Sequence, residues 1–253
     1  MNKGDAMQNV FLVNASLVQD NITEAIRGLI SDAIVVYTFS VDEFLDKARY
    51  YSMQPNVDTI YAVGGDGTVN LLATVLIDTN KKLGIIPMGS NNKIYNSVKN
   101  GGKIDIGYIN EKIFLNHALV VDSGFILEKI NYNEKFNYNE LNDFEFVTNA
   151  YGKYKMMSAS SIVISNGFFN NIDSLLHDGK MEVYFLQNKI KNLNKFLKNS
   201  RNSFLSLEHF STDLLGIMPI IIDGDLYYVS KFDFSISKKQ INIETKQLSL
   251  VRN

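Results

Sequence analysis

Three glycines, an aspartate and a threonine stand close together in residues 63–70, in the order Val-Gly-Gly-Asp-Gly-Thr-Val-Asn. An apolar run leads into them from Thr59, and a second apolar run with helical character follows as far as Leu76. A strand, a glycine turn and a helix in this order point backbone N–H groups and a helix N-terminus at a phosphate group. Glycine also lets a ligand approach the backbone closely. The segment therefore predicts a phosphate-binding site.

The elements that must position this segment are strands and helices in alternation. Apolar runs predict strands at 9–14, 33–38, 59–63 and 83–87, with helices at 22–30, 40–51 and after the glycines. Ser40, with Glu43 three residues later, is the expected N-cap of the second helix. Continuous apolar strands of this kind are typical of a parallel sheet that is covered on both faces. Ligands bind such sheets at the carboxyl ends of the strands. The polar segments that fall at these ends are Asn14, Thr38, Gly64–Thr68 and Gly89–Asn92.

The second half of the chain has a different character. Short strands are expected from about residue 103 onward, one of them at 218–222. Two others, 231–236 and 241–243, alternate polar and apolar residues as half-buried antiparallel strands do. We therefore predict an α/β N-terminal domain with a mostly parallel sheet over residues 1–108. A β-sandwich domain is predicted over residues 109–253.

Composition limits the classes of function. The 253 residues carry a net charge of −2, which gives no reason to expect a nucleic acid partner. The chain has no cysteine, so disulfides and thiol chemistry are excluded. No run is long enough to cross a bilayer, and residues 1–9 show no signal-peptide pattern. We therefore expect a cytoplasmic protein that meets any lipid substrate at a membrane surface, as a peripheral protein.

One basic segment, residues 189–201, combines five basic residues with four apolar ones and contains no acidic residue. A cationic amphipathic helix of this type could contact an anionic membrane. The alternative, which we favour for so short a helix, is a helix that covers the second domain and turns its basic face to water.

Two motifs in sequence resemble the diacylglycerol kinase and sphingosine kinase family of lipid kinases, especially its soluble bacterial members. They are GGDGT at 64–68 and the strand 83–92, LGIIPMGSNN. Four further segments match the family in order: GKIDIG at 102–107, FLN at 114–116, HDGKMEV at 177–183 and IDGD at 222–225. The resemblance extends from Phe11 to Ile243. It implies a nucleotide-binding α/β domain and a β-sandwich domain, with ATP in the cleft between them.

The resemblance implies a set of nucleotide-binding residues. They are Thr38, Gly64, Gly65, Asp66, Gly67, Thr68, Asn70, Ser90 and Asn92. The glycines and Thr68 offer hydrogen-bond donors to phosphate oxygens. Asp66 only accepts hydrogen bonds when ionised, so it would repel a phosphate unless a metal ion lay between them. The alternative for Asp66 is a side chain that stabilises its own turn.

The family places its catalytic base in a late Asp-Gly-Glu motif. The matching position here is Asp225, with Asp223 two residues before it. Aspartate is one methylene shorter than glutamate, and a displacement of about one ångström can matter for catalysis. A hairpin turn with no chemical role is the alternative, because Asp-Gly is a common hairpin signal.

The resemblance also implies a magnesium loop at 175–180. Asp178 would supply a carboxylate oxygen, and Leu175 and Lys180 would supply main-chain carbonyls. His177 replaces an aspartate that is common there. The three histidines of the chain have no mutual spacing for zinc, so we interpret them as structural or surface residues.

Further substitutions separate this chain from the family pattern. Leu71 stands where glutamate is common, and Lys93 stands where aspartate is common. The leading hypothesis is an ATP- and magnesium-dependent kinase that acts on diacylglycerol or a related lipid. A degenerate, nucleotide-binding regulatory protein is the second hypothesis, and an NAD kinase-like enzyme is the third. The oligomeric state is left open, a homodimer included.

Overall fold

The computed structural model describes residues 7–17, 22–88, 92–122, 141–166, 177–186 and 205–248. The chain divides into two compact units, Met1–Ile104 with Lys239–Asn253, and Asp105–Lys238. The sequence predicted one boundary after residue 108. The structure differs because strand β16, Ile241–Thr245, pairs in parallel with β4, Lys82–Pro87, of the first unit. Strand β16 therefore belongs with the first unit.

The first unit contains a six-stranded sheet in the order β2-β1-β3-β4-β16-β5. Its remaining strands are β1 (Gln8–Asn14), β2 (Ile34–Thr38), β3 (Val57–Gly64) and β5 (Gly102–Ile104). All neighbouring pairs are parallel except β16 and β5. The mostly parallel sheet expected from the continuous apolar runs is therefore present.

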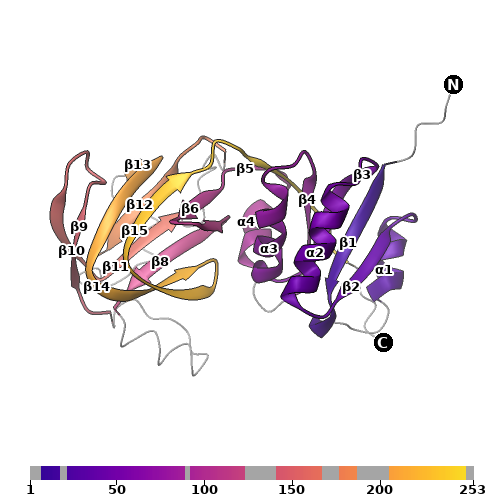
Figure 1. The fold of residues 1–253 in the computed structure, drawn as a ribbon, viewed down its shortest axis with the longest axis horizontal. Helices are drawn as coiled ribbons and strands as arrows, with labels where there is room; N and C mark the ends of the chain where they lie inside the picture. Colours follow the sequence, from indigo (N-terminus) through magenta and orange to yellow (C-terminus); the bar gives the residue numbers. More distant parts are fainter. Residues whose placement is uncertain are drawn as a thin grey trace. The chain divides into compact units, whose positions relative to one another are not determined.

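Helices cover this sheet on both faces. They are η1 (Ala15–Leu17), α1 (Ile22–Leu29), α2 (Val41–Ser52), α3 (Asp66–Leu76) and α4 (Lys93–Val98). Ile22 and Ile26 of α1 pack in one core with Phe11 and Tyr61, whose rings stack at 4.3 Å. Leu12, the next residue of β1, is equally buried and points to the opposite face by strand alternation. Helices α2 and α3 pack against each other and lie in front of the strands (Figure 1). These strands are apolar throughout because successive side chains point to opposite faces of the sheet and both faces are buried.

The second unit consists of antiparallel strands in its described residues. They are β6 (Gly107–Ile109), β7 (Lys112–Phe114), β8 (His117–Val121), β9 (Phe144–Thr148), β10 (Lys155–Ala159), β11 (Ser161–Ser165), β12 (Met181–Leu186), β13 (Leu205–Leu207), β14 (His209–Ile222) and β15 (Asp225–Ile236). They are hydrogen-bonded in one connected ten-stranded sheet around an aromatic core. The all-β content agrees with the prediction, whereas the two-sheet form of a sandwich stays a prediction.

The long strand β14 connects two parts of this sheet. Thr212 and Asp213 pair with β9, whereas Ile220, Ile221 and Ile222 pair with β8. Between them the register with β15 shifts, because the chain from Asp213 to Met218 forms a bulge. Strand β14 thus pairs with β9 before the register shift and with β8 after it.

None of the helices in the described ranges is both long and apolar enough to span a membrane.

Candidate active site

The glycine segment joins strand and helix with no intervening loop. Strand β3 ends at Gly64, Gly65 is the N-cap residue in an extended conformation, and α3 begins at Asp66. The first hydrogen bond of the helix runs from the Val69 N–H to the Gly65 carbonyl. Because the N-cap residue is a glycine, it makes no side-chain hydrogen bond to this end of α3. The first N–H groups of α3 thus have no partner within the helix, which is the arrangement that favours an anion.

The glycines of this junction serve different purposes. A Cβ atom on Gly64 would lie 2.4 Å from Thr68 Oγ1, so a larger residue cannot fit there without displacing the Thr68 side chain. A Cβ atom on Gly67 would meet nothing within 4 Å. Packing therefore explains Gly64, whereas Gly67 leaves open space beside the first turn of α3.

Asp66 has a role that the sequence did not indicate. Its side chain is only 4% exposed, and its two carboxylate oxygens accept the N–H groups of Lys93 (2.9 Å) and Ile94 (3.0 Å) at the start of α4. Burial raises the pKa of the Asp66 carboxyl, and the two N–H groups oppose that rise. Asp66 thus caps a neighbouring helix rather than its own turn. Asn92, the N-cap residue of α4, makes no side-chain capping bond.

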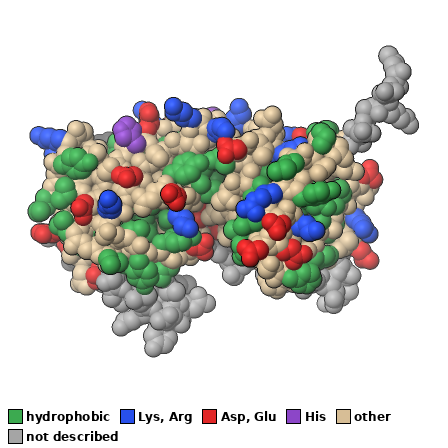
Figure 2. All heavy atoms as spheres, in the orientation of Figure 1, with side chains coloured by type: hydrophobic (Ala, Val, Ile, Leu, Met, Phe, Trp, Pro, Cys, Tyr) green, Lys and Arg blue, Asp and Glu red, His purple; other side chains and the backbone are tan. Residues whose placement is uncertain are grey.

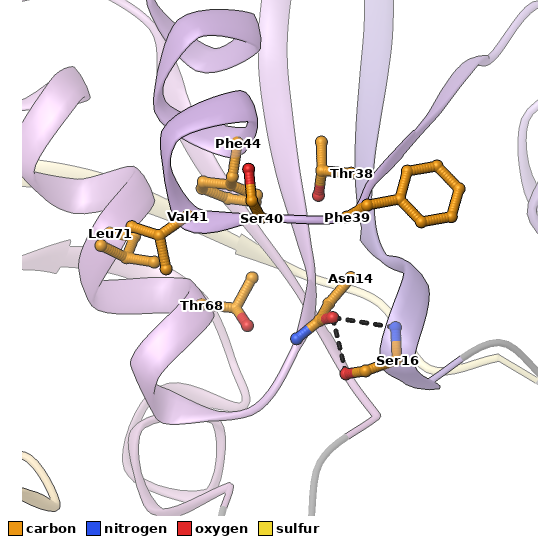
Figure 3. Close-up of a pocket in the computed structure, with 9 residues that line it drawn as sticks. All are labelled: Asn14, Ser16, Thr38, Phe39, Ser40, Val41, Phe44, Thr68 and Leu71. Atoms are coloured by element: carbon orange, nitrogen blue, oxygen red, sulfur yellow. Dashed lines mark hydrogen bonds between the residues drawn. The ribbon is translucent and has the colours of Figure 1, made fainter.

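A cavity of about 240 Å³ opens beside this junction in the first unit (Figure 3). It is lined by Asn14, Ser16, Thr38, Phe39, Ser40, Val41, Phe44, Thr68 and Leu71. Asn14 ends β1, Thr38 ends β2 and Thr68 lies in the first turn of α3, so the ends of neighbouring parallel strands meet here as expected. The sequence-predicted residues Thr38 and Thr68 share this cavity.

Hydrogen bonds fix the polar wall of the cavity. Asn14 Oδ1 accepts the Ser16 N–H (3.1 Å) and the Ser16 hydroxyl (2.7 Å), as Figure 3 shows. Thr38 Oγ1 donates to the Val13 carbonyl at 3.2 Å. The predicted cap of α2 is confirmed, since Ser40 Oγ accepts the Glu43 N–H at 3.1 Å. These contacts hold the wall in place without a ligand.

Asn70, one of the predicted nucleotide-binding residues, has a buried side-chain atom that lacks a hydrogen-bond partner among the described residues. Its Oδ1 is buried and accepts no hydrogen bond in the described part of the protein. A buried acceptor of this kind calls for an explanation such as a water, an ion or a ligand donor. Ser90 and Leu175 lie outside the described residues.

The Asp223-Gly224 pair forms a two-residue hairpin turn between β14 and β15. Both residues have positive φ, 47° and 102°, as a type I′ turn requires. The Asp223 carboxylate is 4% exposed and accepts N–H groups from three consecutive residues, 115–117, at 2.7–3.3 Å. This arrangement anchors the hairpin on the segment before β8. Asp225, the first residue of β15, is exposed.

The Asp178 turn rests on the same segment of the second unit. Asp178 Oδ1 accepts the Lys180 N–H at 2.9 Å, and Gly179 has a φ of 75°. The Gly179 N–H donates to Asp105 Oδ2 at 2.6 Å. Asn166 Nδ2 donates to the carbonyls of Asp105 (2.9 Å) and Leu115 (3.3 Å). The turn that carries Asp178 and the turn that carries Asp223 are therefore both held by residues 105–117.

Asp105 and Asn166 are structural partners that the sequence analysis missed. Asp105 is 1% exposed and stands between two isoleucines, Ile104 and Ile106. An acid between two apolar residues is the signal that could have identified it. Within the described ranges no three acidic, histidine or cysteine side chains gather as a metal cluster, so a magnesium ion at Asp178 would depend on carbonyl oxygens and water.

Residues 11–126, which include the glycine junction and its cavity, match the family model described as the diacylglycerol kinase catalytic domain. The chain is related to the diacylglycerol kinase family of lipid kinases. The Asp178 and Asp223 turns lie beyond the part that this model matches.

Curated relatives that are named as probable lipid kinases share part of the sequence. A protein of Klebsiella pneumoniae (strain 342), named "Probable lipid kinase YegS-like", is 36% identical over 84 residues, 32% of this chain and 28% of that protein. Its namesake in Enterobacter sp. (strain 638) is 31% identical over 119 residues, 38% of this chain and 40% of that protein. The aligned parts thus span less than half of these lipid kinase relatives.

The fold is shared over a greater length. A crystal structure of a diacylglycerol kinase from Bacillus anthracis str. Sterne superposes with a TM-score of 0.73 at 15% sequence identity. The superposition covers 93% of this chain and 96% of that one. The chain therefore shares the fold of that structure.

Proposed function

We propose that the protein is an ATP- and magnesium-dependent kinase that phosphorylates the hydroxyl of diacylglycerol or a related lipid. The observation that carries the proposal is the junction between β3 and α3, where the chain passes through Gly64 and Gly65 into a helix end with no side-chain cap. Such an end favours the charged oxygens of a phosphate group. The lipid acceptor follows from the relatives, which are named as lipid kinases.

The nucleotide is proposed to bind along the first unit. Phosphate oxygens would accept N–H groups from Asp66, Gly67 and Thr68, where the open space beside Gly67 leaves room for them. The cavity that contains Thr38 would receive another part of the nucleotide. Asn70 Oδ1 offers a buried acceptor to a ligand hydroxyl or to a water. Ser90 and Asn92 would complete the set.

Asp225 is proposed as the catalytic base. Its exposed carboxylate would take the proton of the lipid hydroxyl as that oxygen bonds to the γ-phosphorus, while the bond from phosphorus to the oxygen of ADP breaks. Asp223 is proposed to act through position only, because its carboxylate already accepts three N–H groups. Magnesium supplies neutralising charge for the phosphates when bound.

The Asp178 turn is proposed as a second magnesium site, with a structural purpose. Oxygen atoms of Asp178, Leu175 and Lys180 suit this ion chemically. One Asp178 oxygen already holds the Lys180 N–H, so the carboxylate is oriented in advance.

Labelled ATP and dispersed diacylglycerol test the kinase activity directly. We expect lipid-dependent transfer by the natural protein and a loss of roughly 10²–10⁴-fold in kcat for Asp225→Asn. Asp233→Asn is the matched control, because Asp233 is also an exposed aspartate of β15. Absence of transfer across a panel of diacylglycerols and related lipids would contradict the proposal, as would equal losses in the two variants.

A nucleotide-binding protein without kinase activity is the second candidate. Both oxygens of Asp66 hold α4, and Lys93 at the start of that helix places a positive charge beside it. This arrangement suits the binding of an anion more than the coordination of a metal ion. Calorimetry that detects ATP binding, together with Asp225→Ala leaving every measured activity unchanged, would favour this candidate.

A further inference from the structure

The hairpin of β9 and β10 carries an exposed group of aromatic, apolar and basic side chains. Tyr151 (44% exposed), Tyr154 (67%) and Met156 (65%) lie within six residues of one another. Lys153 and Lys155 alternate with them and are exposed as well. No acidic residue occurs between Asn149 and Met157. In Figure 2 hydrophobic and basic side chains lie side by side at the end of the second unit where Figure 1 shows β9 and β10, with some acidic ones nearby.

The acidic residues of the hairpin lie at its other end. Glu145 pairs with Ser158, three residue pairs away from Thr148 and Lys155, which close the loop. Asp213, on the neighbouring strand β14, pairs with Val147 beside the loop and lies opposite Lys231 in β15. The loop itself, residues 149–157, therefore carries two lysines and no acidic residue.

The loop is held firmly by the rest of the second unit. The Asn149 N–H donates to the Ser211 carbonyl at 3.2 Å, and the Ser211 N–H donates to Asn149 Oδ1 at 2.7 Å. The Tyr151 ring packs against Phe185 at 6.0 Å, and Lys155 Nζ lies 4.9 Å above the Tyr151 ring. Exposure of these side chains is therefore a property of a fixed loop, since its backbone and one of its rings are tied to the sheet.

We propose that this loop, residues 149–157, docks the protein onto the surface of an anionic lipid bilayer. Tyrosine is enriched at membrane interfaces because its ring is apolar and its hydroxyl can stay in water. The two lysines would bind anionic headgroups while their hydrocarbon stems lie along the apolar side chains. The inference rests on the proposed function, since it names the surface on which a lipid kinase would meet its substrate.

The size of the exposed group favours a bilayer over a protein partner. Three partly exposed side chains offer much less than the roughly 800 Å² that each partner contributes to a stable protein interface. Shallow contact with headgroups needs only a few aromatic side chains and a favourable charge.

Vesicle sedimentation without ATP tests the docking surface. The natural protein is expected to bind vesicles of three parts phosphatidylcholine to one part phosphatidylglycerol, less at high salt, and pure phosphatidylcholine weakly. Lys153→Gln with Lys155→Gln is expected to weaken binding to the mixed vesicles by roughly tenfold or more. Tyr154→Ser with Met156→Ser is expected to weaken binding to both kinds of vesicle.

Tyr50→Ser with Met53→Ser is the matched control. These residues of the first unit are 59% and 77% exposed, so the control removes the same two residue types from another surface. Vesicle binding equal to that of the natural protein in both loop variants would overturn the proposal. An equal loss in the control variant would also overturn it. A loop variant that alters self-association in sedimentation velocity, yet leaves vesicle binding intact, would identify a protein interface instead.

A second assay separates this inference from the proposed activity. Phosphoryl transfer to a short-chain diacylglycerol dissolved in water needs no bilayer, so the Lys153→Gln, Lys155→Gln variant should match the natural protein there. Vesicle binding with no phosphoryl transfer in any variant would count against the kinase and leave the docking surface intact. Phosphoryl transfer with no vesicle binding would support the kinase activity and count against the docking surface.

Discussion

At the scale of single residues, the glycines at the junction of β3 and α3 have different roles, one in packing and one in leaving room for a ligand. Gly64 is required by the Thr68 side chain, whereas the space beside Gly67 is open. Asp66, which follows the N-cap residue of α3, uses both its carboxylate oxygens to cap α4. One motif of five residues thus combines a close-packed glycine, a buried helix cap and a position with room for a phosphate.

Substitution of the two glycines by alanine tests this division. Gly67→Ala should keep or raise stability by up to about 1 kcal/mol, because alanine is the better helix former, yet it should weaken ATP binding. Gly64→Ala should lower stability by about 1–3 kcal/mol, since its Cβ collides with Thr68. Urea unfolding and titration calorimetry with ATP measure the two effects. Unchanged ATP affinity in Gly67→Ala would show that no phosphate approaches this position.

At the scale of elements, the hairpin of β14 and β15 explains why two acids in one turn differ so much. The left-handed backbone of the turn directs the Asp223 carboxylate onto the N–H groups of residues 115–117. The Asp225 side chain, on the first residue of β15, is exposed. The hairpin interpretation and the catalytic interpretation of this motif are therefore compatible, since one acid holds the turn and the other is available to a substrate.

The two acids should respond differently to removal. Asp223→Ala leaves three buried N–H groups without an acceptor, so we expect a loss of about 2–4 kcal/mol in the free energy of unfolding. Asp225→Ala changes an exposed side chain and should stay within about 0.5 kcal/mol of the natural protein. Urea unfolding measures the free energy of unfolding of both variants. A stable Asp223→Ala protein would contradict the anchoring role.

At the scale of the whole molecule, the chain leaves the first unit and returns to it. Strand β16 lies between β4 and β5, with Ile241 and Ile243 buried. The Tyr61 hydroxyl of β3 contacts the Glu244 carboxylate at 2.5 Å, and burial together with this bond raises the pKa of Tyr61. The sheet of the first unit is therefore complete only when β16 has been added.

A substitution near the C-terminus should consequently weaken the N-terminal unit. We expect Ile243→Ala to lower the free energy of unfolding by about 2–5 kcal/mol through the cavity it leaves. Amide hydrogen exchange should accelerate in β4, which pairs with Ile243, and not in β14 or β15. Asn242→Ala is the control, since Asn242 is exposed on the same strand. Faster exchange confined to residues 105–238 would contradict this assignment.

Much of the fold was predictable because local patterns determine it. Continuous apolar runs gave the parallel strands, and Ser40 with Glu43 gave the start of α2. The sequence predicted a strand only from Met218, whereas β14 begins at His209. The bulge after Asp213 interrupts the alternation of residues there, and no local pattern reveals such a bulge.

The sequence by itself determined the strand and helix order, the glycine junction and the set of candidate residues, because each depends on neighbours along the chain. Only the tertiary structure decided what the acids do. Asp66 caps a helix 27 residues away, and Asp223 binds N–H groups more than 100 residues away. Whether a carboxylate is buried on backbone donors or exposed depends on which distant segment packs beside it, and that information is present only in the folded chain.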